Sequence, residues 1–318
     1  MLRSFKITSE QDDVRLDIFL SEKLTLTRTK IKEMIEGGHV RVAGRVPKPS
    51  MRLKAGVEIS GDIPDEESVD LAPEEIPLAV LYEDMYFLAI DKPADMVVHP
   101  SFGHSSGTLV NAVLGYMERQ GSGFEVMGQG KEEGQKDPMA GMRPGIVHRL
   151  DKGTTGVILV ARDSQTQEKL SGLFKNREVE KTYRAIVEGS PPWDVLTVDG
   201  NIGRHPVDRK KMAVLRSGGR HATTGFKVLE RFAGFSLVEA YPATGRTHQI
   251  RVHLSHAGFP IVGDETYGRR AKKSAMRALL HAYRIEFVHP FTGAPVKIEA
   301  PVPVDMDEFV EKHRGQNA

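Results

Sequence analysis

The chain has 318 residues, of which 39% are hydrophobic and 27% charged, a composition that is ordinary for a globular protein and argues against disorder or a fibrous repeat. Its formal net charge is +1, and because it contains no cysteine, disulfides, thiol catalysis and cysteine-based zinc sites are excluded. It has neither an apolar run long enough for a transmembrane helix nor a signal-peptide pattern, so we expect a soluble, cytoplasmic protein without membrane contact.

Residues 1–60 predict a small module of two helices and a hairpin. One helix fits residues 14–24, and a second, capped by Thr27 or Thr29, ends at a pair of glycines. The apolar residues expected to face inward are Leu16, Phe19 and Leu20 in the first helix and Ile31, Met34 and Ile35 in the second. Val40 and Val42 then alternate into an Ala43-Gly44 turn and a second strand.

Basic residues concentrate in this module. Between residues 28 and 54, eight basic residues stand against two acids, a pattern suited to a phosphate backbone, although a solvated face is the plainer interpretation. Residues 14–60 also resemble the S4-type RNA-binding domain, in which a basic helix and the following turn contact folded RNA. The RNA contacts expected here are Arg28, Lys30, Lys32, Arg41 and Arg45.

An acidic segment separates this module from a larger domain. Residues 61–77 hold seven acids, three prolines and no basic residue, which is typical of a solvated linker. The large domain is expected at residues 78–318, with a surface insertion at 120–142. Its predicted strands are 79–81, 87–91, 156–161, 182–187, 226–230 and 236–241, and its predicted helices are 109–117, 164–174 and 247–257. Helices do not alternate regularly with these strands, so we expect an α+β fold with a mixed, mostly antiparallel sheet.

The stretch GIVHRLDKGTTGVILVAR, residues 145–162, places His148, Arg149 and Asp151 within four consecutive residues before an apolar strand. Asp151 could simply close a turn by accepting backbone N–H bonds. Catalytic groups also occur in such loops. The residues of this stretch alone leave both interpretations open.

Other stretches offer partners for Asp151. Tyr183 lies on a predicted strand, where packing is the plainer role. His248, His253 and His256 do not have the i, i+4 spacing of a zinc pair, whereas His248 shares a helical face with Arg251. The residues KGTTG lack the spacing of a phosphate-binding P-loop.

Five stretches together resemble the RluA/RluD family of RNA pseudouridine synthases: GIVHRLDKGTTG, DKPADMVVHP, KTYRAIVEG, IGRHPVDRKKMAV and GRTHQIRVHLSHAGFPIVGDETYG. They span nearly the whole chain and occur in the family's order. Two residues depart from the family pattern, since Asp95 replaces the usual Gly and Thr155 the usual Ser.

The resemblance implies an isomerase that detaches uracil from its ribose, rotates it and reattaches it through carbon 5. It makes Asp151 the nucleophile, with attack on the sugar or on the base left open. A carboxylate facing a uracil pocket needs a nearby cation to stay ionised, and this role falls to Arg251, with Arg246 as second choice and a bidentate grip expected. Tyr183 is expected to stack on the base and to assist loss of the carbon-5 proton.

The target uridine must leave its stack to be reached. Arg149 is two residues from Asp151 on the same face of an extended segment, so it is expected to fill the vacated stack, while His148 points away and is structural. Arg246 and His248 complete the expected RNA contacts. No metal or other cofactor is expected, the expected partner is large-subunit ribosomal RNA or its precursor, and the protein is expected to be a monomer.

Two alternatives stay open. The chain could be an RNA-binding ribosome assembly factor whose catalysis is vestigial. It could also be a glycosidase that pairs Asp151 with Asp264 or Glu265, although nothing in the spacing shows that either carboxylate lies across from Asp151.

Overall fold

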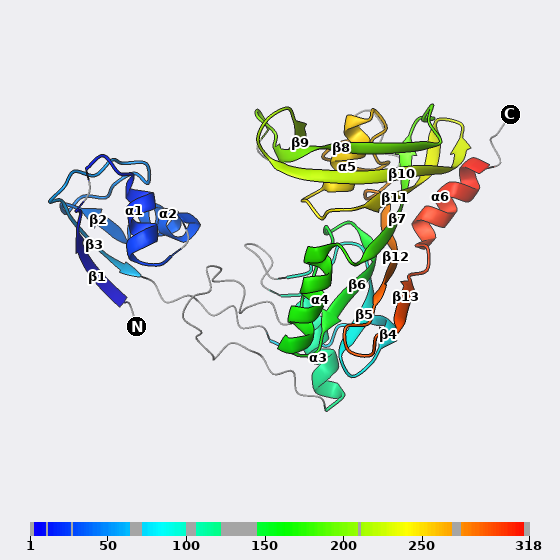
Figure 1. Ribbon diagram of the computed structural model, residues 1–318, viewed down its shortest axis with the longest axis horizontal. Helices are drawn as coiled ribbons and strands as arrows, with labels where there is room; N and C mark the ends of the chain where they lie inside the picture. The colour runs from blue at the N-terminus through cyan, green and yellow to red at the C-terminus, as the bar shows by residue number, and fades with distance from the viewer. Residues whose placement is uncertain are drawn as a thin grey trace. The chain divides into compact units, whose positions relative to one another are not determined.

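The computed structural model describes residues 3–10, 12–26, 28–63, 72–99, 106–121, 145–208, 211–268 and 275–314. These residues form two compact units (Figure 1), an N-terminal unit up to residue 63 and a large unit from residue 72 onward, each with its own hydrophobic core. Thr27 lies outside the described residues, and so does the expected insertion from residue 122 on.

The N-terminal unit combines two helices with a three-stranded antiparallel sheet in the order β1-β3-β2. Its elements are β1 (Arg3–Thr8), α1 (Leu16–Lys23), α2 (Arg28–Glu36), β2 (Val40–Val42) and β3 (Glu58–Ile63). The six apolar residues predicted to face inward are all buried in one cluster, so the two predicted helices and their inward faces are confirmed.

The predicted hairpin is only partly correct. Ala43 and Gly44 have φ values of 46° and 78° and form a tight turn, across which Val42 and Arg45 exchange backbone hydrogen bonds. No strand follows this turn directly, because β2 pairs with β3 instead, with Val42 opposite the buried Ile59. Burial of a distant partner decides the pairing, and the local pattern does not contain that information.

A ten-stranded mixed sheet forms the large unit, in the order β4-β5-β6-β12-β7-β11-β10-β8-β9, with β13 also paired to β12. The strands are β4 (Ala79–Glu83), β5 (Phe87–Lys92), β6 (Thr155–Ala161), β7 (Glu180–Glu188), β8 (Val195–Arg204), β9 (Met212–Leu215), β10 (Arg220–Phe232), β11 (Phe235–Pro242), β12 (Leu280–Val288) and β13 (Pro295–Glu299). Among the described strand pairs only β6 and β12 run parallel, which confirms the mixed, mostly antiparallel sheet.

Four helices accompany this sheet in the described part of the chain: α3 (Leu109–Arg119), α4 (Ser164–Asn176), α5 (Gln249–His256) and α6 (Val304–Arg314). Asp163 begins α4 by accepting the Thr166 amide at 2.8 Å, and Thr108 caps α3. The first three helices were predicted, whereas β8, β9, β12, β13 and α6 have no counterpart among the predicted elements.

The large sheet has a separate hydrophobic core in each half. One core contains Phe87, Leu159 and Phe287 and joins β5, β6, β12 and β13 to α4. The other contains Phe226 and Leu254 and joins β7, β10 and β11 to α5. Because β12 and β7 are neighbours in the sheet, the two halves meet between them.

A glycine controls where β6 approaches β12. Gly156 has φ 106°, which favours glycine, and a Cβ there would collide with the carbonyl oxygen of Ala282 on β12. The two backbones therefore touch at this position. Since β6 begins at Thr155, this contact positions the loop that precedes the strand.

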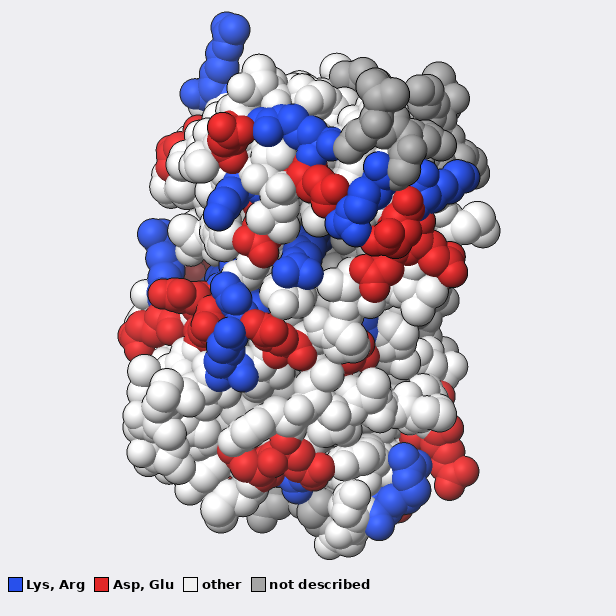
Figure 2. Space-filling model, turned by 90° about the vertical axis from the view of Figure 1, so that its right-hand side faces the viewer, with Lys and Arg blue, Asp and Glu red and all other residues white. Residues whose placement is uncertain are grey.

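One outer face of the large unit carries charges of both signs. Figure 2 views the structure from the side of α6 and β13, where acidic and basic residues lie next to one another. Ion pairs of α6 contribute to this pattern, among them Arg277–Asp305 at 2.7 Å and Arg314–Glu230 at 2.8 Å. Within the described ranges, no helix combines the length and the apolar character needed to cross a bilayer.

Candidate active site

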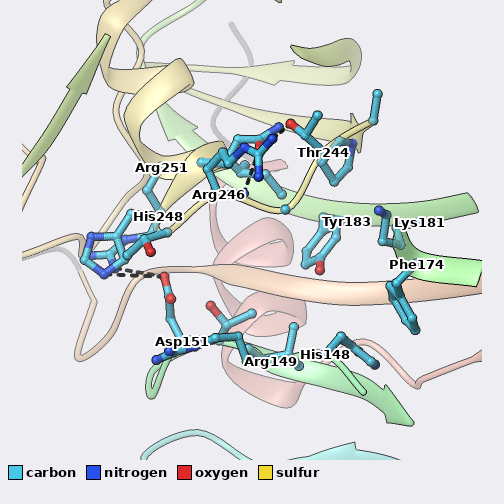
Figure 3. A pocket seen from close by; sticks show the side chains of 18 of the residues that line it. His148, Arg149, Asp151, Phe174, Lys181, Tyr183, Thr244, Arg246, His248 and Arg251 are labelled. Atoms are coloured by element: carbon cyan, nitrogen blue, oxygen red, sulfur yellow. Dashed lines mark hydrogen bonds and ion pairs between the residues drawn. The ribbon is translucent and has the colours of Figure 1, made fainter. Parts of the chain in front are cut away.

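A pocket of about 570 Å³ opens where segments from both halves of the large sheet come together (Figure 3). One wall is the loop before β6, and a second is β7 with the end of α4. The third wall is the segment that follows β11 and enters α5. The walls thus unite parts of the chain that are about a hundred residues apart.

Asp151 faces this pocket from a turn that the backbone itself closes. The Thr154 amide donates to the Asp151 carbonyl oxygen at 3.0 Å. The carboxylate Oδ2 accepts a hydrogen bond from Arg251 Nη1 at 3.1 Å and lies 3.9 Å from His248 Nε2. Its side chain is 25% exposed, so a ligand can reach it. The turn-closing interpretation therefore does not describe the carboxylate.

Arg251, on the first turn of α5, is held from behind by a buried acid. Its Nε and Nη2 donate to Asp264 at 2.7 and 2.8 Å, and the Asp264 side chain is 0% exposed. Burial opposes the charge of Arg251, but the bonds from Asp264 and Asp151 outweigh it and raise its pKa. Burial likewise opposes ionisation of Asp264, and Arg251 overcomes this and lowers the pKa of Asp264. Both groups stay charged.

This arrangement corrects one detail of the prediction. The contact between Arg251 and Asp151 is present, but the bidentate grip is on Asp264, and Asp151 receives a single bond. The planar fork of an arginine can grip one carboxylate on one edge and still offer an N–H to a second. Asp264 therefore orients the Arg251 guanidinium so that its Nη1 donates to Asp151.

His248 occupies a strained position beside the same carboxylate. Its φ of 55° is in the left-handed region, and its Nδ1 lies 2.8 Å from the Tyr267 hydroxyl, which accepts the Met212 amide at 2.9 Å. Burial lowers the pKa of His248 more than the charge of Asp151 raises it, so the ring is neutral. From this network we assign the Tyr267 proton to the bond with Nδ1, which leaves the ring proton on Nε2, toward Asp151.

Tyr183 projects from β7 into the middle of the pocket (Figure 3). Burial, assisted by the negative charge of Asp151, raises the pKa of its phenol. The side chain is thus a neutral aromatic ring near neutral pH. Such a ring offers a stacking surface for a planar ligand.

Two cations, the buried Lys92 and the half-buried Arg277, hold the backbone of the Asp151 turn, and the sequence predicted a role for neither. Lys92 is 0% exposed and donates to the carbonyl oxygens of Pro93, Met96 and Lys152 at 2.7, 2.9 and 3.1 Å. Arg277 Nη1 donates to Gly153 O at 3.3 Å. Burial, together with the charge of Arg277, lowers the pKa of Lys92 to about 8. Lys92 belongs to the quoted DKPADM stretch, which was the available sign of its importance.

The remaining predicted pocket residues also lie at this site. Arg149 is exposed at the pocket wall, and Arg246 is half-buried with its Nε donating to His221 O at 3.0 Å. His148 lines the pocket too, but its Nε2 accepts the Leu159 amide at 2.9 Å, as expected for a structural residue. Burial lowers the pKa of His148 to about 3, so it stays neutral.

The predicted RNA contacts of the N-terminal unit differ in their surroundings. Arg28 is paired with the buried Asp17 at 2.7 Å, which offsets its charge. Lys32 lies 3.5 Å from Glu36, and Arg41 reaches Gly44 O at 3.4 Å. Arg45 is exposed, and like Lys30 it stays a predicted RNA contact.

Comparison with known proteins now decides the family. Residues 86–256 match the family model described as RNA pseudouridylate synthase, and residues 14–59 match the S4 domain. The chain belongs to the RNA pseudouridylate synthase family. It is therefore an RNA pseudouridine synthase, an isomerase, and the resemblance inferred from the five stretches is confirmed.

Relatives of this pseudouridine synthase match along most of its length. An uncharacterized RNA pseudouridine synthase of Bacillus subtilis, YlyB, is 40% identical and covers 96% of both chains. The ribosomal large subunit pseudouridine synthase D of Xanthomonas campestris is 39% identical over 96% of this chain and 90% of its own. Among solved structures, human RNA pseudouridylate synthase domain containing 1 has a TM-score of 0.56 at 25% identity and covers 76% of this chain and 96% of its own.

The two departures of this pseudouridine synthase from the family pattern have different local settings. Asp95 has φ 63°, a left-handed conformation that explains why glycine is usual there. Thr155 is buried, and its hydroxyl lies 2.9 Å from Nδ1 of the buried His281. A serine could make the same bond, so this exchange keeps the contact.

The geometry also bears on the glycosidase alternative. Asp264 is buried, and besides Arg251 it accepts the amides of Thr266 and Tyr267. Glu265 is exposed and does not line the pocket. Asp151 is the one acid among the described residues that line it, so a second carboxylate for glycoside hydrolysis is missing from this set.

Proposed function

We propose that this enzyme isomerises uridine to pseudouridine at specific positions of large-subunit ribosomal RNA, with Asp151 as the nucleophile. The observation that carries the proposal is the Asp151 carboxylate, accessible in the pocket and bonded to Arg251 at 3.1 Å. The charge-assisted hydrogen bond from the guanidinium holds the carboxylate in place, and a carboxylate can act as a nucleophile that forms a covalent adduct.

The isomerisation exchanges one glycosidic bond for another. The bond between N1 and C1′ breaks, a bond between C5 and C1′ forms, N1 gains a proton and C5 loses one. The Asp151 carboxylate can add to C1′ of the sugar, which displaces uracil as the N1–C1′ bond breaks, or it can add to the base, in which case the N1–C1′ bond still has to break before the uracil turns. In either route the bond to Asp151 breaks again by the time the C5–C1′ product is released. No oxidant or reductant enters, because reactant and product have the same composition.

Tyr183 and Arg149 supply the surroundings for an extruded base. The Tyr183 ring is neutral and faces the pocket, so it can stack on the uracil next to Asp151. As a neutral phenol it can take the C5 proton only by giving up its own, which makes stacking the better supported role. The exposed Arg149 is two residues from Asp151 and can occupy the space that the uridine leaves in the RNA.

The choice of ribosomal RNA rests on two supports. Relatives that match more than nine-tenths of this chain include enzymes named ribosomal large subunit pseudouridine synthase D, with 92% of the chain covered in one and 96% in another. The S4 domain adds a second basic surface that can contact folded RNA beyond the pocket. Binding energy at a remote surface can select one uridine among many.

The test is tritium release from unmodified large-subunit ribosomal RNA labelled at C5 of uridine. Wild-type protein should release tritium, and Asp151→Asn should abolish release while keeping RNA affinity. Asp194→Asn is the matched control, because Asp194 is 85% exposed and outside the pocket. Tritium release by Asp151→Asn at the wild-type rate would refute the assignment of Asp151 as the nucleophile.

The same experiment also tests the proposed RNA substrate. Transcripts of small-subunit ribosomal RNA and transfer RNA are offered in parallel, and equal release from them would overturn the choice of the large subunit. Tight binding of ribosomal RNA with every uridine unchanged would favour an assembly factor instead. Chemical mapping of the modified positions then gives the target sites.

A further inference from the structure

A second group of charges lines the pocket apart from the Asp151–Arg251 pair. Figure 3 shows Lys181 on the far side of Tyr183 from Asp151, and Arg246 above the pocket on the Arg251 side of Tyr183. Arg177, at the end of α4, and Arg220, at the start of β10, line the same pocket. We call Arg177, Lys181, Arg220 and Arg246 the cation cluster.

The members of the cation cluster repel one another. Burial lowers the pKa of Lys181 and the charge of Arg177 lowers it further. Burial also lowers the pKa of Arg246, with added repulsion from Arg220 and Arg177. Among the described residues, no carboxylate lies within ion-pair distance of any of the four. The nearest aromatic support for Lys181 is the Phe174 ring, 5.9 Å from Nζ.

Other arginines of this unit are paired in the ordinary way. Arg251 is matched by Asp264, and Arg277 by Asp305. The cation cluster therefore differs from these arginines, because its members lack a carboxylate partner among the described residues. Lys181 and Arg246 are half-buried, whereas Arg177 and Arg220 are exposed. Like charges gathered around partly desolvated groups destabilise the free protein unless an anion joins them.

Arg177 adds a second local cost. It is the C-cap residue of α4 and has φ 66° and ψ 31°, the left-handed conformation for which glycine is favoured. A side chain there strains the backbone. The chain thus keeps an arginine at a position where glycine would be more stable, which indicates a use for its charge.

We propose that the cation cluster is a phosphate subsite that binds a backbone phosphodiester of the RNA beside the extruded uridine, while the Asp151 end receives the base and ribose. This inference rests on the proposed RNA substrate. Arg246 was predicted to contact RNA, and the subsite extends this contact to Lys181, Arg177 and Arg220.

The spacing within β7 fits this division of the pocket. Lys181 and Tyr183 are two residues apart on one strand, so their side chains share a face roughly 7 Å apart. A base stacked on Tyr183 then brings the neighbouring phosphate within reach of the long lysine side chain. An uncharged edge of uracil would offset none of the repulsion, whereas a phosphodiester carries the negative charge that the cluster lacks.

The first test is the salt dependence of RNA binding by the full-length protein, with a large-subunit ribosomal RNA transcript as the probe. For Lys181→Met we expect roughly tenfold weaker binding, the loss of one charge-assisted hydrogen bond. The slope of log affinity against log salt should become shallower by about 0.7, as for one phosphate contact on a single strand. Lys181→Arg should retain the wild-type slope.

Lys169→Met is the matched control. Lys169 is on α4 outside the pocket and contacts the Phe291 ring, so this variant loses the same charge without a phosphate contact. It should leave the slope unchanged. An unchanged slope in Lys181→Met, or an equal change in Lys169→Met, would overturn the subsite.

Thermal stability separates a binding role from a structural one. Lys181→Met relieves repulsion and Arg177→Gly also relieves backbone strain, so both should melt at or above the wild-type temperature while binding RNA more weakly. A lower melting temperature with unchanged affinity would make these residues structural. Because binding is measured apart from turnover, an RNA that binds without reacting refutes the proposed function and still tests the phosphate subsite.

Discussion

Asp264→Asn tests whether the buried acid behind Arg251 controls the reactivity of Asp151. The change keeps the size of the side chain but removes its charge and replaces one acceptor with an amide donor. Asp264 is 0% exposed and holds Arg251 by two bonds of 2.7 and 2.8 Å, so the variant leaves the largely buried guanidinium with only its single bond to Asp151 as counter-charge. Breaking one side of a buried ion pair costs about 3–5 kcal/mol of unfolding free energy.

The expected effect on rate follows from the single bond between Arg251 and Asp151. If Arg251 swings out of line, the loss of one charge-assisted hydrogen bond of about 1.5–3 kcal/mol lowers kcat roughly ten- to a hundredfold. Tritium release under saturating RNA measures kcat, and urea unfolding measures stability. The double variant Asp264→Asn with Arg251→Met should be less destabilised than the sum of the two single changes, because no buried charge is left unpaired.

Asp305→Asn is the matched control for this prediction. Asp305 grips Arg277 in the same bidentate geometry, at 2.7 and 2.8 Å, but its side chain is 47% exposed. An ion pair with an exposed partner contributes about 1 kcal/mol or less. If Asp264→Asn were as mild as Asp305→Asn in both stability and kcat, the reasoning from burial would be refuted.

Three further predictions concern the scaffold. Asp95→Gly should raise the melting temperature, because removal of a left-handed non-glycine residue relieves up to about 1 kcal/mol of strain; calorimetry showing a decrease would contradict this. Gly156→Ala should lower the unfolding free energy by about 3 kcal/mol or more, or prevent folding, because the added Cβ would collide with the Ala282 carbonyl. Normal expression with native stability would disprove this. The hydrogen bond from Arg15, reinforced by Arg28 against the effect of burial, lowers the pKa of Asp17 from 3.8 to about 2. The folded form thus holds the carboxylate more strongly ionised than the unfolded form, so the stabilisation is present above about pH 4 and is lost as the pH falls toward 2. Asp17→Asn should lower the unfolding free energy by about 1–2 kcal/mol at neutral pH and should weaken the loss of stability between pH 4 and pH 2. Hydrogen exchange of α1 in the full chain measures both effects.

Local patterns predicted the elements whose burial is periodic. Leu16, Phe19 and Leu20 recur at helical spacing and are buried together, and Phe87 begins an apolar strand that the structure also contains. By contrast, β12 mixes a buried His281 with charged residues because it is central at one end and paired with β13 at the other. Its place between β6 and β7 depends on partners far away in the sequence, which no local pattern records.

In the candidate site, too, some residues could be predicted from the sequence and others depend on contacts between distant segments. Asp151, Arg251 and Tyr183 were found through the family's motifs, and the structure brings them to one pocket. The bidentate hold of Asp264 on Arg251 was missed, because a loop separates the two residues and no periodic spacing relates them. Lys92 was missed because its three acceptors are backbone carbonyls, to which any residue type can contribute.

The two members of the central ion pair are positioned by different halves of the sheet. Lys92 and Arg277 hold the turn of Asp151 through backbone carbonyls on the side of β6. Arg251 is held by Asp264 on the side of α5. The distance between the Asp151 and Arg251 side chains is therefore determined by how the two halves pack at β12 and β7. A change at this junction that leaves every pocket residue in place should still alter kcat, since it changes the Arg251–Asp151 bond between the two halves.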